Sequence, residues 1–119
     1  MADEIRVVTS LSVNNGNLKS PGTTYNITHD QAAAVAPAPG GVNIGTAEET
    51  ISFGDVTPGW VEIVNLDDTN FVDLGFSTGV YGITIPAGST CLFKMKSGAT
   101  IYAKADTAAV ELMVRGVND

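Results

Sequence analysis

At 119 residues, the chain has the length of one domain, and its 44% hydrophobic content predicts a globular core rather than disorder. Six basic against thirteen acidic residues give a formal net charge of −7, so phosphates would meet a repulsive field and nucleic acid is excluded as the expected partner. No apolar stretch approaches the roughly 18 residues that span a bilayer. The acidic start, Met1–Glu4, also lacks the apolar region of a signal peptide. We therefore expect no nucleic-acid or membrane partner.

The first elements are strand-like. Residues 4–13 alternate apolar and polar side chains, which predicts a half-buried strand. Val8 interrupts the polar side of this strand, which indicates that this side is also covered, for example by a neighbouring subunit. Asn15-Gly16 is a type I′ hairpin signal, because both residues tolerate positive φ. A weaker strand is expected over residues 23–28.

Residues 30–41 differ in composition, being rich in Ala, Pro and Gly. Gln31–Ala36 has the composition of one or two helical turns, capped at the N-terminus by Asp30. Pro37 and Pro39 forbid a longer helix. Two interpretations stay open for the segment: a surface loop, or an arm that orders on a partner.

The rest of the chain consists of short runs rich in Val, Ile, Phe, Tyr and Thr, separated by Gly or Pro-Gly turns. This pattern is typical of antiparallel strands. We expect strands at residues 42–46, 49–53, 60–66, 70–76, 80–85, 90–96, 100–104 and 109–115. Eight to ten strands in this length predict an all-β fold, a two-sheet antiparallel β-sandwich that is jelly-roll-like. It would be a single domain over residues 1–119 with a flexible N-terminus.

The single cysteine, Cys91, excludes an intrachain disulfide framework. Cys91 shares one side of its expected strand with Phe93 and Met95, which predicts a small buried hydrophobe rather than a nucleophile. The only histidine, His29, lies far away in the sequence.

The best candidate for metal chemistry is the acidic segment that holds Asp67, Asp68 and Asn70. Crowded oxygen ligands can hold calcium, but the spacing of an EF-hand is absent. The alternative is a turn between strands, in which Asn and Asp side chains bond their own backbone. We expect the turn, and neither a metal nor another cofactor.

Catalysis by paired carboxylates would need an acid and a base facing one cleft. Glu48, Glu49, Asp55 and Glu62 are available, but none stands out from an exposed rim residue. The chain also lacks a nucleophile with a neighbouring base and a His or Cys ligand set. We therefore expect no enzyme.

Trp60, the only tryptophan, follows the turn at Pro58-Gly59. We expect it to pack in the core; the alternative is a surface role in which it stacks on a sugar or anchors an interface. The candidate interface residues are one on the first strand, three in or beside the Ala/Pro/Gly segment, and this tryptophan: Val8, Val35, Pro37, Pro39 and Trp60.

The order of strands and turns carries a family resemblance. The segments Glu49–Val56, Pro58–Trp60, Asn65–Gly75, Ile85–Gly88 and Ile101–Ala105 resemble a recurring pattern in small virion proteins of tailed bacteriophages. These proteins include capsid decoration, or cement, proteins and related tail and fibre modules. The resemblance spans residues 46–114 and includes no catalytic motif.

The resemblance implies a structural protein on the capsid surface of a virion, made in the cytoplasm of the host bacterium. Its expected partner is the phage major capsid protein, whose subunits it would bridge. A homo-oligomer is expected as well, a trimer or alternatively a dimer. The alternative function is a carbohydrate-binding or structural module of a tail fibre or spike, in which Trp60, Tyr81 and Tyr102 would stack on sugar rings.

Overall fold

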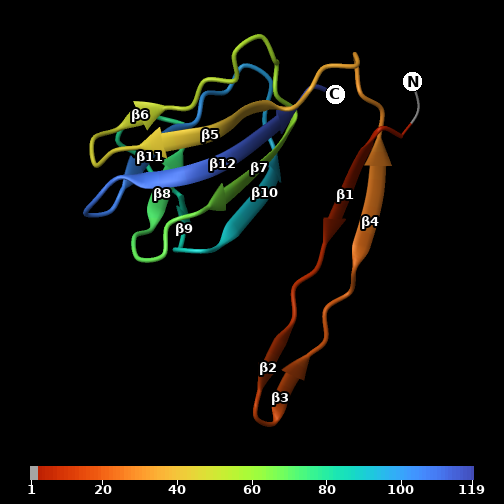
Figure 1. Ribbon diagram of the computed structural model, residues 1–119. Coiled ribbons are helices and arrows are strands. Elements are labelled where there is room, and N and C mark those ends of the chain that lie inside the picture. Colours follow the sequence, from red (N-terminus) through yellow and green to blue (C-terminus); the bar gives the residue numbers. More distant parts are fainter. Residues whose placement is uncertain (1–2) are drawn as a thin grey trace. The chain divides into compact units, whose positions relative to one another are not determined.

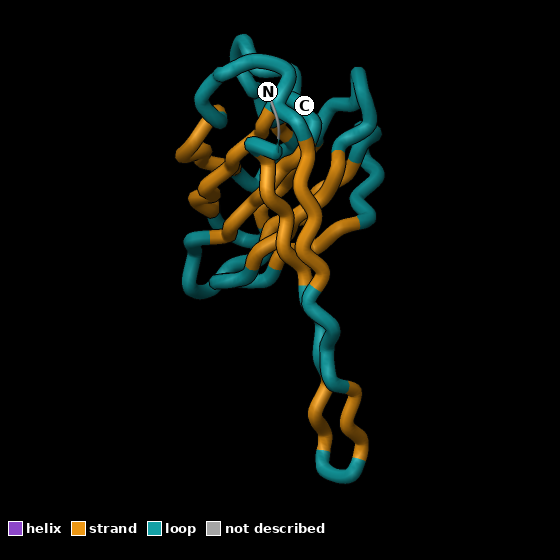
Figure 2. Tube along the Cα trace, turned by 90° about the vertical axis from the view of Figure 1, so that its right-hand side faces the viewer, coloured by secondary structure: helices purple, strands orange, loops and turns teal. Residues whose placement is uncertain are grey.

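The computed structural model describes residues 3–119, and this part of the chain consists of strands and loops without a helix (Figures 1 and 2). We expected one domain, but the chain divides into two compact units, one within the first 34 residues and the other over Val35–Asn118. The expected flexible N-terminus falls partly on Met1 and Ala2, which lie outside the described residues.

The first unit is a long antiparallel hairpin. β1 (Ile5–Thr9) pairs with β4 (Tyr25–His29), and the shorter β2 (Val13–Asn15) pairs with β3 (Leu18–Ser20). Between β2 and β3 lies a two-residue turn that begins with Gly16, whose φ is 56°. The turn is therefore centred on Gly16 and Asn17, one residue later than predicted. Positive φ at the first central residue alone fits a type II′ turn better than type I′.

Polar side chains close the base of this hairpin. The backbone N–H of Asp3 donates to Oδ1 of Asp30 at 2.8 Å, and the Thr28 hydroxyl donates to Oδ1 of Asp3 at 3.0 Å. Asp30 thus holds the hairpin rather than capping a helix, and the predicted helical turn at 31–36 is wrong. A six-residue segment that ends at a proline is too short to recover the cost of helix nucleation.

The second unit is the predicted two-sheet antiparallel β-sandwich. One sheet has the strand order β10-β7-β12-β5 and the other β6-β11-β8-β9, so eight strands form two four-stranded sheets as in a jelly roll. The strands are β5 (Ala38–Ile44), β6 (Glu49–Thr50), β7 (Trp60–Asn65), β8 (Val72–Gly75), β9 (Ile83–Ile85), β10 (Thr90–Lys94), β11 (Tyr102–Ala105) and β12 (Val110–Val117).

The segment of residues 30–41 was interpreted above as a loop or an arm, but only residues 30–37 lack regular structure. Its last residues, from Ala38, belong to β5, which pairs along β12 from Ala38↔Gly116 to Ile44↔Val110. Pro39 is tolerated there because β5 is an edge strand, where an N–H can be missing without breaking a ladder.

The core lies between the two sheets and is aliphatic. Alternate residues of each strand point inward: in β7, for example, Val61, Ile63 and Asn65 are buried while Trp60, Glu62 and Val64 are half-buried. All buried members of the core cluster belong to the second unit: Ile44, Ile51, Phe53, Val61, Ile63, Val72, Leu74, Ile85, Met95, Ile101, Ala103, Ala105, Val110, Leu112 and Val114. The sandwich is therefore complete without the hairpin.

Candidate interaction surfaces

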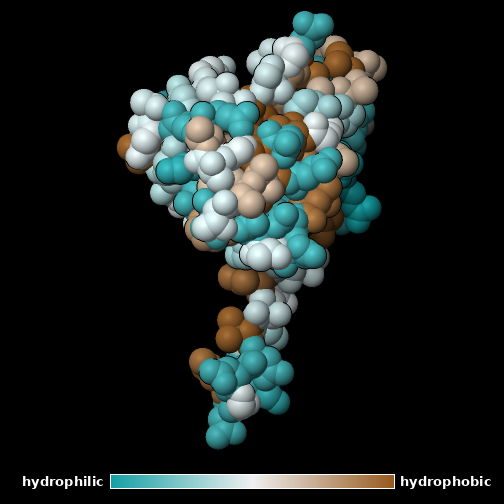
Figure 3. All heavy atoms as spheres, turned by 60° about the vertical axis from the view of Figure 1, so that its left-hand side comes forward, coloured by the Kyte–Doolittle hydropathy of each residue, from teal (hydrophilic) through white to brown (hydrophobic). Residues whose placement is uncertain are grey.

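The hairpin exposes large hydrophobic side chains along most of its length. Figure 3 shows hydrophobic residues on its surface, interrupted by hydrophilic ones toward the tip. Leu11 is 85% exposed, and Leu18 and Tyr25 are each 63% exposed. The full set of exposed large hydrophobic residues in this unit is Val8, Leu11, Val13, Leu18, Tyr25 and Ile27. Six such side chains on one two-stranded ribbon are unusual for a surface with no partner.

The hairpin also differs from the rest of the chain in charge. Ile5–His29 contains Arg6 and Lys19 but neither Asp nor Glu, so its formal charge is +2. The remaining residues carry thirteen acidic and four basic side chains, a formal charge of −9. A basic, apolar hairpin thus belongs to an otherwise acidic protein.

A second apolar surface is the outward face of the sheet β10-β7-β12-β5. The register places Trp60, Glu62 and Val64 on this face, opposite the buried side of β7. Trp60 is thus outside the core cluster, so the predicted core role was wrong and the surface role remains. Leu92 of β10 and Met113 of β12 lie on the same face and are 37% and 39% exposed.

One ion pair crosses this outward face. Arg115 Nη2 lies 2.6 Å from Glu62 Oε1, and Nε of the same guanidinium donates to that oxygen at 2.8 Å. Their side chains are 58% and 35% exposed, so solvent screens the pair and its contribution to stability is small. The pair neutralises two charges in the middle of the face, while Lys94 and Glu111 lie toward its two ends.

A third surface is one end of the sandwich, which we call the acidic end. It consists of loops 45–48, 66–71, 86–89 and 106–109 with the adjoining Glu49 and Glu111. Backbone hydrogen bonds join these segments: Ala105 N–H to Gly45 O at 2.9 Å, Leu66 N–H to Glu111 O at 2.9 Å, Gly88 N–H to Asn65 O at 3.1 Å and Asp106 N–H to Phe71 O at 3.1 Å.

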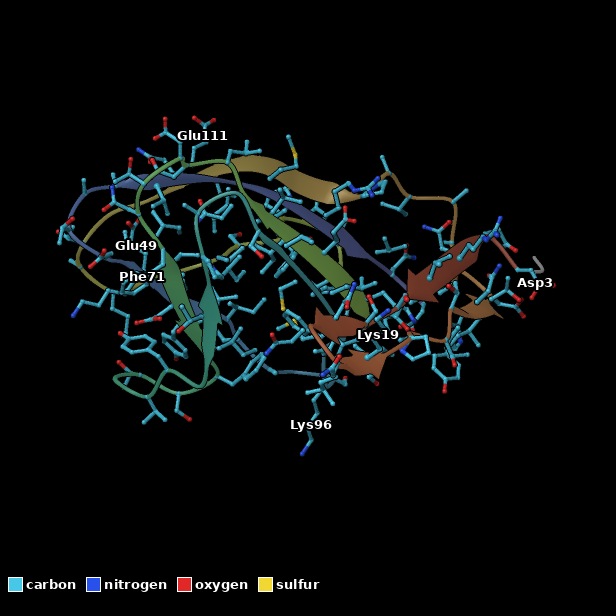
Figure 4. All side chains as sticks on the ribbon, turned by 90° about the horizontal axis from the view of Figure 1, so that it is seen from below. Asp3, Lys19, Glu49, Phe71, Lys96 and Glu111 are labelled. Atoms are coloured by element: carbon cyan, nitrogen blue, oxygen red, sulfur yellow. The ribbon has the colours of Figure 1, made fainter. Side chains whose placement is uncertain are left out.

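The acidic end combines negative charge with exposed apolar residues. Its segments hold no Lys or Arg but six carboxylates: Glu48, Glu49, Asp67, Asp68, Asp106 and Glu111. Leu66 is 54% exposed and Phe71 36%. Figure 4 shows Glu49, Phe71 and Glu111 at this end of the sandwich.

The Asp67, Asp68 and Asn70 segment is built as a turn. Oδ2 of Asp67 accepts the backbone N–H groups of Thr69 and Asn70 at 3.0 and 2.6 Å. These hydrogen bonds stabilise the carboxylate and lower the pKa of Asp67. Among the described residues, no group of three His, Cys, Asp or Glu side chains is arranged to hold a metal ion. The side-chain bonding is what the turn interpretation predicted.

Asn65 fixes this turn from inside the core. It is fully buried, and its Nδ2 donates to the carbonyl oxygens of Asn70 and Ile85 at 3.0 and 3.1 Å. Its Oδ1 accepts the backbone N–H of Asp67 at 2.9 Å. One buried amide therefore satisfies three backbone groups and positions the acidic turn.

Glu48 organises a loop on the outward side of the other sheet. Its carboxylate accepts hydrogen bonds from the Thr78 hydroxyl, the Gly79 backbone N–H at 2.7 Å and the Tyr81 hydroxyl at 2.6 Å. The bonds from Thr78 and Tyr81 in particular lower the pKa of Glu48, and the bond to Glu48 raises the pKa of Tyr81 to about 12. The cluster ties the 76–82 loop to the start of β6.

Cys91 takes the predicted hydrophobic role. It is partly buried and, like Phe93, packs against the core, while Met95 is buried within it. Burial raises the pKa of the Cys91 thiol, which favours the unreactive protonated form.

The candidate interface residues are dispersed. Val8 belongs to the hairpin and is 47% exposed, and Val35 and Pro37 are exposed residues ahead of β5. Only Pro39 and Trp60 share a surface, because Pro39 pairs with Arg115 on the outward face described above.

The three aromatic residues considered for sugar stacking do not form one platform. Trp60 lies on the outward face of one sheet, whereas Tyr102 lies on that of the other, beside Gly75 in the register. The Tyr81 hydroxyl is engaged by Glu48.

The hairpin is the surface that the sequence pattern missed. The alternation in residues 4–13 was interpreted as a half-buried strand, and in β1 Ile5 and Val7 are indeed buried. Leu11 and Val13, which continue the same alternating apolar positions, are exposed. The signal that distinguishes this segment is the absence of any Asp or Glu from Ile5 to His29 in an acidic chain.

No helix long and apolar enough to cross a membrane occurs in the described residues. Comparisons with protein-family models, with curated proteins and with solved structures found no match.

Proposed function

We propose that this protein is a structural component of a tailed-phage virion that binds the outside of the capsid and stabilises it by bridging subunits of the major capsid protein. It would be made in the host bacterial cytoplasm and would be neither an enzyme nor a cofactor-binding protein. The proposal builds on the resemblance of residues 46–114 to small phage virion proteins.

The observation that carries the proposal is the outward face of β10-β7-β12-β5. It presents Leu92 and Met113 beside half-buried Trp60 on a four-stranded sheet with a complete core behind it. A sheet face with an apolar group among charged and polar side chains fits binding of another protein, because burial of apolar area and an aromatic anchor supply most of the binding energy. This face would contact the capsid protein.

The test is cosedimentation of the purified protein with expanded capsids of the phage that encodes it. We expect saturable binding. Leu92→Glu combined with Met113→Glu should weaken it on the order of a hundredfold, because two charges would be buried without partners. Thr100→Glu, at an exposed loop position between β10 and β11, is the control and should bind normally. Failure of the unaltered protein to bind any capsid form would exclude the proposal.

A further inference from the structure

We propose that the hairpin Ile5–His29 is a docking arm, and that it binds the acidic end of the sandwich in a second copy of this chain. The inference concerns contacts between copies and does not rest on the proposed capsid function, which uses a different face.

The first step is the unmet packing of the hairpin beyond Ile5 and Val7, which are buried. A two-stranded hairpin is at best marginally stable in water unless its apolar side chains pack against something else. In β4, Tyr25 and Ile27 are 63% and 49% exposed, and in β3 Leu18 is 63% exposed. The hairpin therefore needs a partner surface that accepts apolar side chains.

The second step is charge complementarity. Between Ile5 and His29 the hairpin carries Arg6 and Lys19 and no carboxylate, so an acidic surface would attract this part of it, and the carboxylates at its base, Asp3, Glu4 and Asp30, would stay outside the contact. A polyanion such as nucleic acid is a poor candidate, since the remainder of the protein carries a formal charge of −9. An acidic protein surface fits better.

The acidic end has both required properties. It offers Leu66 and Phe71 as exposed apolar contacts, and its segments hold six carboxylates and no Lys or Arg. Protein–protein interfaces usually combine apolar contacts with polar groups. The charges of the two surfaces are opposite, and both present apolar side chains.

The exposure of both surfaces favours a second copy, because Leu18 and Tyr25 of the arm and Leu66 and Phe71 of the acidic end are all exposed within one chain. The hairpin continues through residues 30–37 into β5, which starts at Ala38 beside Gly116, at the end of the sheet opposite the acidic end. Seven residues of β5 separate the two ends by about 23 Å at the rise of an extended strand. This distance does not by itself prevent docking within one chain, because a hairpin with about twelve residues in each strand is longer than β5, and the experiment below distinguishes the two cases.

The experiment measures self-association of the full chain by sedimentation velocity over a concentration series at low salt. We expect association that weakens as salt is added, because the contact is charge-assisted. Arg6→Glu with Lys19→Glu, in the arm, and Asp68→Lys with Asp106→Lys, at the acidic end, should each weaken it on the order of tenfold or more.

Mixing the arm variant with the end variant is the decisive experiment. The end variant keeps the unaltered arm and the arm variant keeps the unaltered acidic end, so a mixture of the two restores the native contact and should associate although each variant alone does not. Asp55→Lys, at the opposite end of the sandwich, makes one such charge reversal outside the acidic end and should leave association unchanged. Leu11→Ser with Leu18→Ser should also reduce association, since both side chains are exposed and contribute little to the core.

Two results would overturn the proposal. One is an unaltered chain that remains monomeric at all concentrations and salt levels. If the arm variant then changes the melting temperature at every concentration alike, the hairpin docks within one chain and the proposed contact between copies is wrong. The other is association that persists in both charge-reversal variants, which would place the contact elsewhere. Capsid cosedimentation is scored separately, so failure of either proposal is distinguishable from failure of the other.

Discussion

At the scale of single residues, Asn65 is the polar group on which the acidic end depends most. Replacing it with Ala would leave the carbonyl oxygens of Asn70 and Ile85 without their donor in a buried site. We expect Asn65→Ala to lower the free energy of unfolding by about 3 kcal/mol, the cost of unsatisfied buried groups plus a small cavity. Urea denaturation measures this change.

Two further variants delimit the Asn65 prediction. Asn65→Asp keeps the shape but points acceptors at two carbonyls, and it should be at least as destabilising at neutral pH. Asn43→Ala, on the exposed side of β5, should change stability by about 0.5 kcal/mol or less. Equal effects of Asn65→Ala and Asn43→Ala would contradict the assigned role.

Glu48 makes stability depend on pH in a defined direction. Its hydrogen bonds lower its pKa in the folded state below the usual 4.5, so the folded protein binds this proton less readily than the unfolded chain. The stabilisation is therefore present above the usual pKa and is lost as pH falls through the folded value. The gap in Tm between the unaltered protein and Glu48→Gln should narrow as pH falls below about 4.5.

Tyr81 makes the stability of the same cluster depend on pH in the alkaline range. Its pKa is raised to about 12, so its contribution is present below the usual value of 10 and is lost as pH rises toward the raised value. Absorbance titration of the phenol should give a lower pKa for Tyr81 in Glu48→Gln than in the unaltered protein, because the hydrogen bond to the Glu48 carboxylate is the largest cause of the raised value. Tyr81→Phe should retain part of the acid-side effect, because the Thr78 and Gly79 donors remain. A Tm gap that stays constant at every acidic pH would contradict the Glu48 prediction.

At the scale of elements, the sequence predicted the sandwich well and the hairpin poorly, for a physical reason. The strands of the second unit alternate against one core, so burial and pattern agree, as in β12, where every second residue from Val110 is buried. The hairpin alternates as well, but Leu11 and Val13 are exposed in this chain. Alternation identifies a strand but does not say what covers it.

The candidate site residues were harder to predict than the strands, because their roles depend on register. Trp60 was expected inside, since both sides of its strand carry apolar residues. Only the pairing of β7 with β10 and β12 shows that Val61 and Ile63 take the buried side. A shift of one residue would reverse the two faces, and local sequence does not determine it. Asp67 was easier, because an Asx turn is a local structure.

The packing of β12 depends on a glycine. Gly116 faces inward, and a Cβ at this position would lie 2.5 Å from Cδ1 of Phe53 and 3.2 Å from the backbone oxygen of Ala38. We expect Gly116→Ala to destabilise the sandwich by about 1–3 kcal/mol, since the ring must move out of a packed core. Chemical denaturation measures the loss.

Two variants separate this overlap from general effects of alanine. Gly82→Ala is the matched control, because a Cβ there meets nothing within 4 Å and the backbone φ is not positive. Phe53→Leu should partly relieve Gly116→Ala in the double variant, giving a favourable coupling energy. Additive effects of the two substitutions would show that the ring is not the obstacle.

At the scale of the whole molecule, the two units differ in how they are stabilised. The sandwich holds every member of the buried core cluster, and β12 joins β5 to β7 at its centre. A chain that starts at Val35 should therefore unfold cooperatively, with a Tm within about 5 °C of the full chain. The comparison with the full chain should be made in high salt, where association through the arm is weakest.

A chain that stops at Ala109, before β12, should show no cooperative transition, because β5 would lose its only partner strand and β7 one of its two. Loss of cooperative unfolding in the chain from Val35 onward would mean that the hairpin is part of the folding unit rather than an arm added to it.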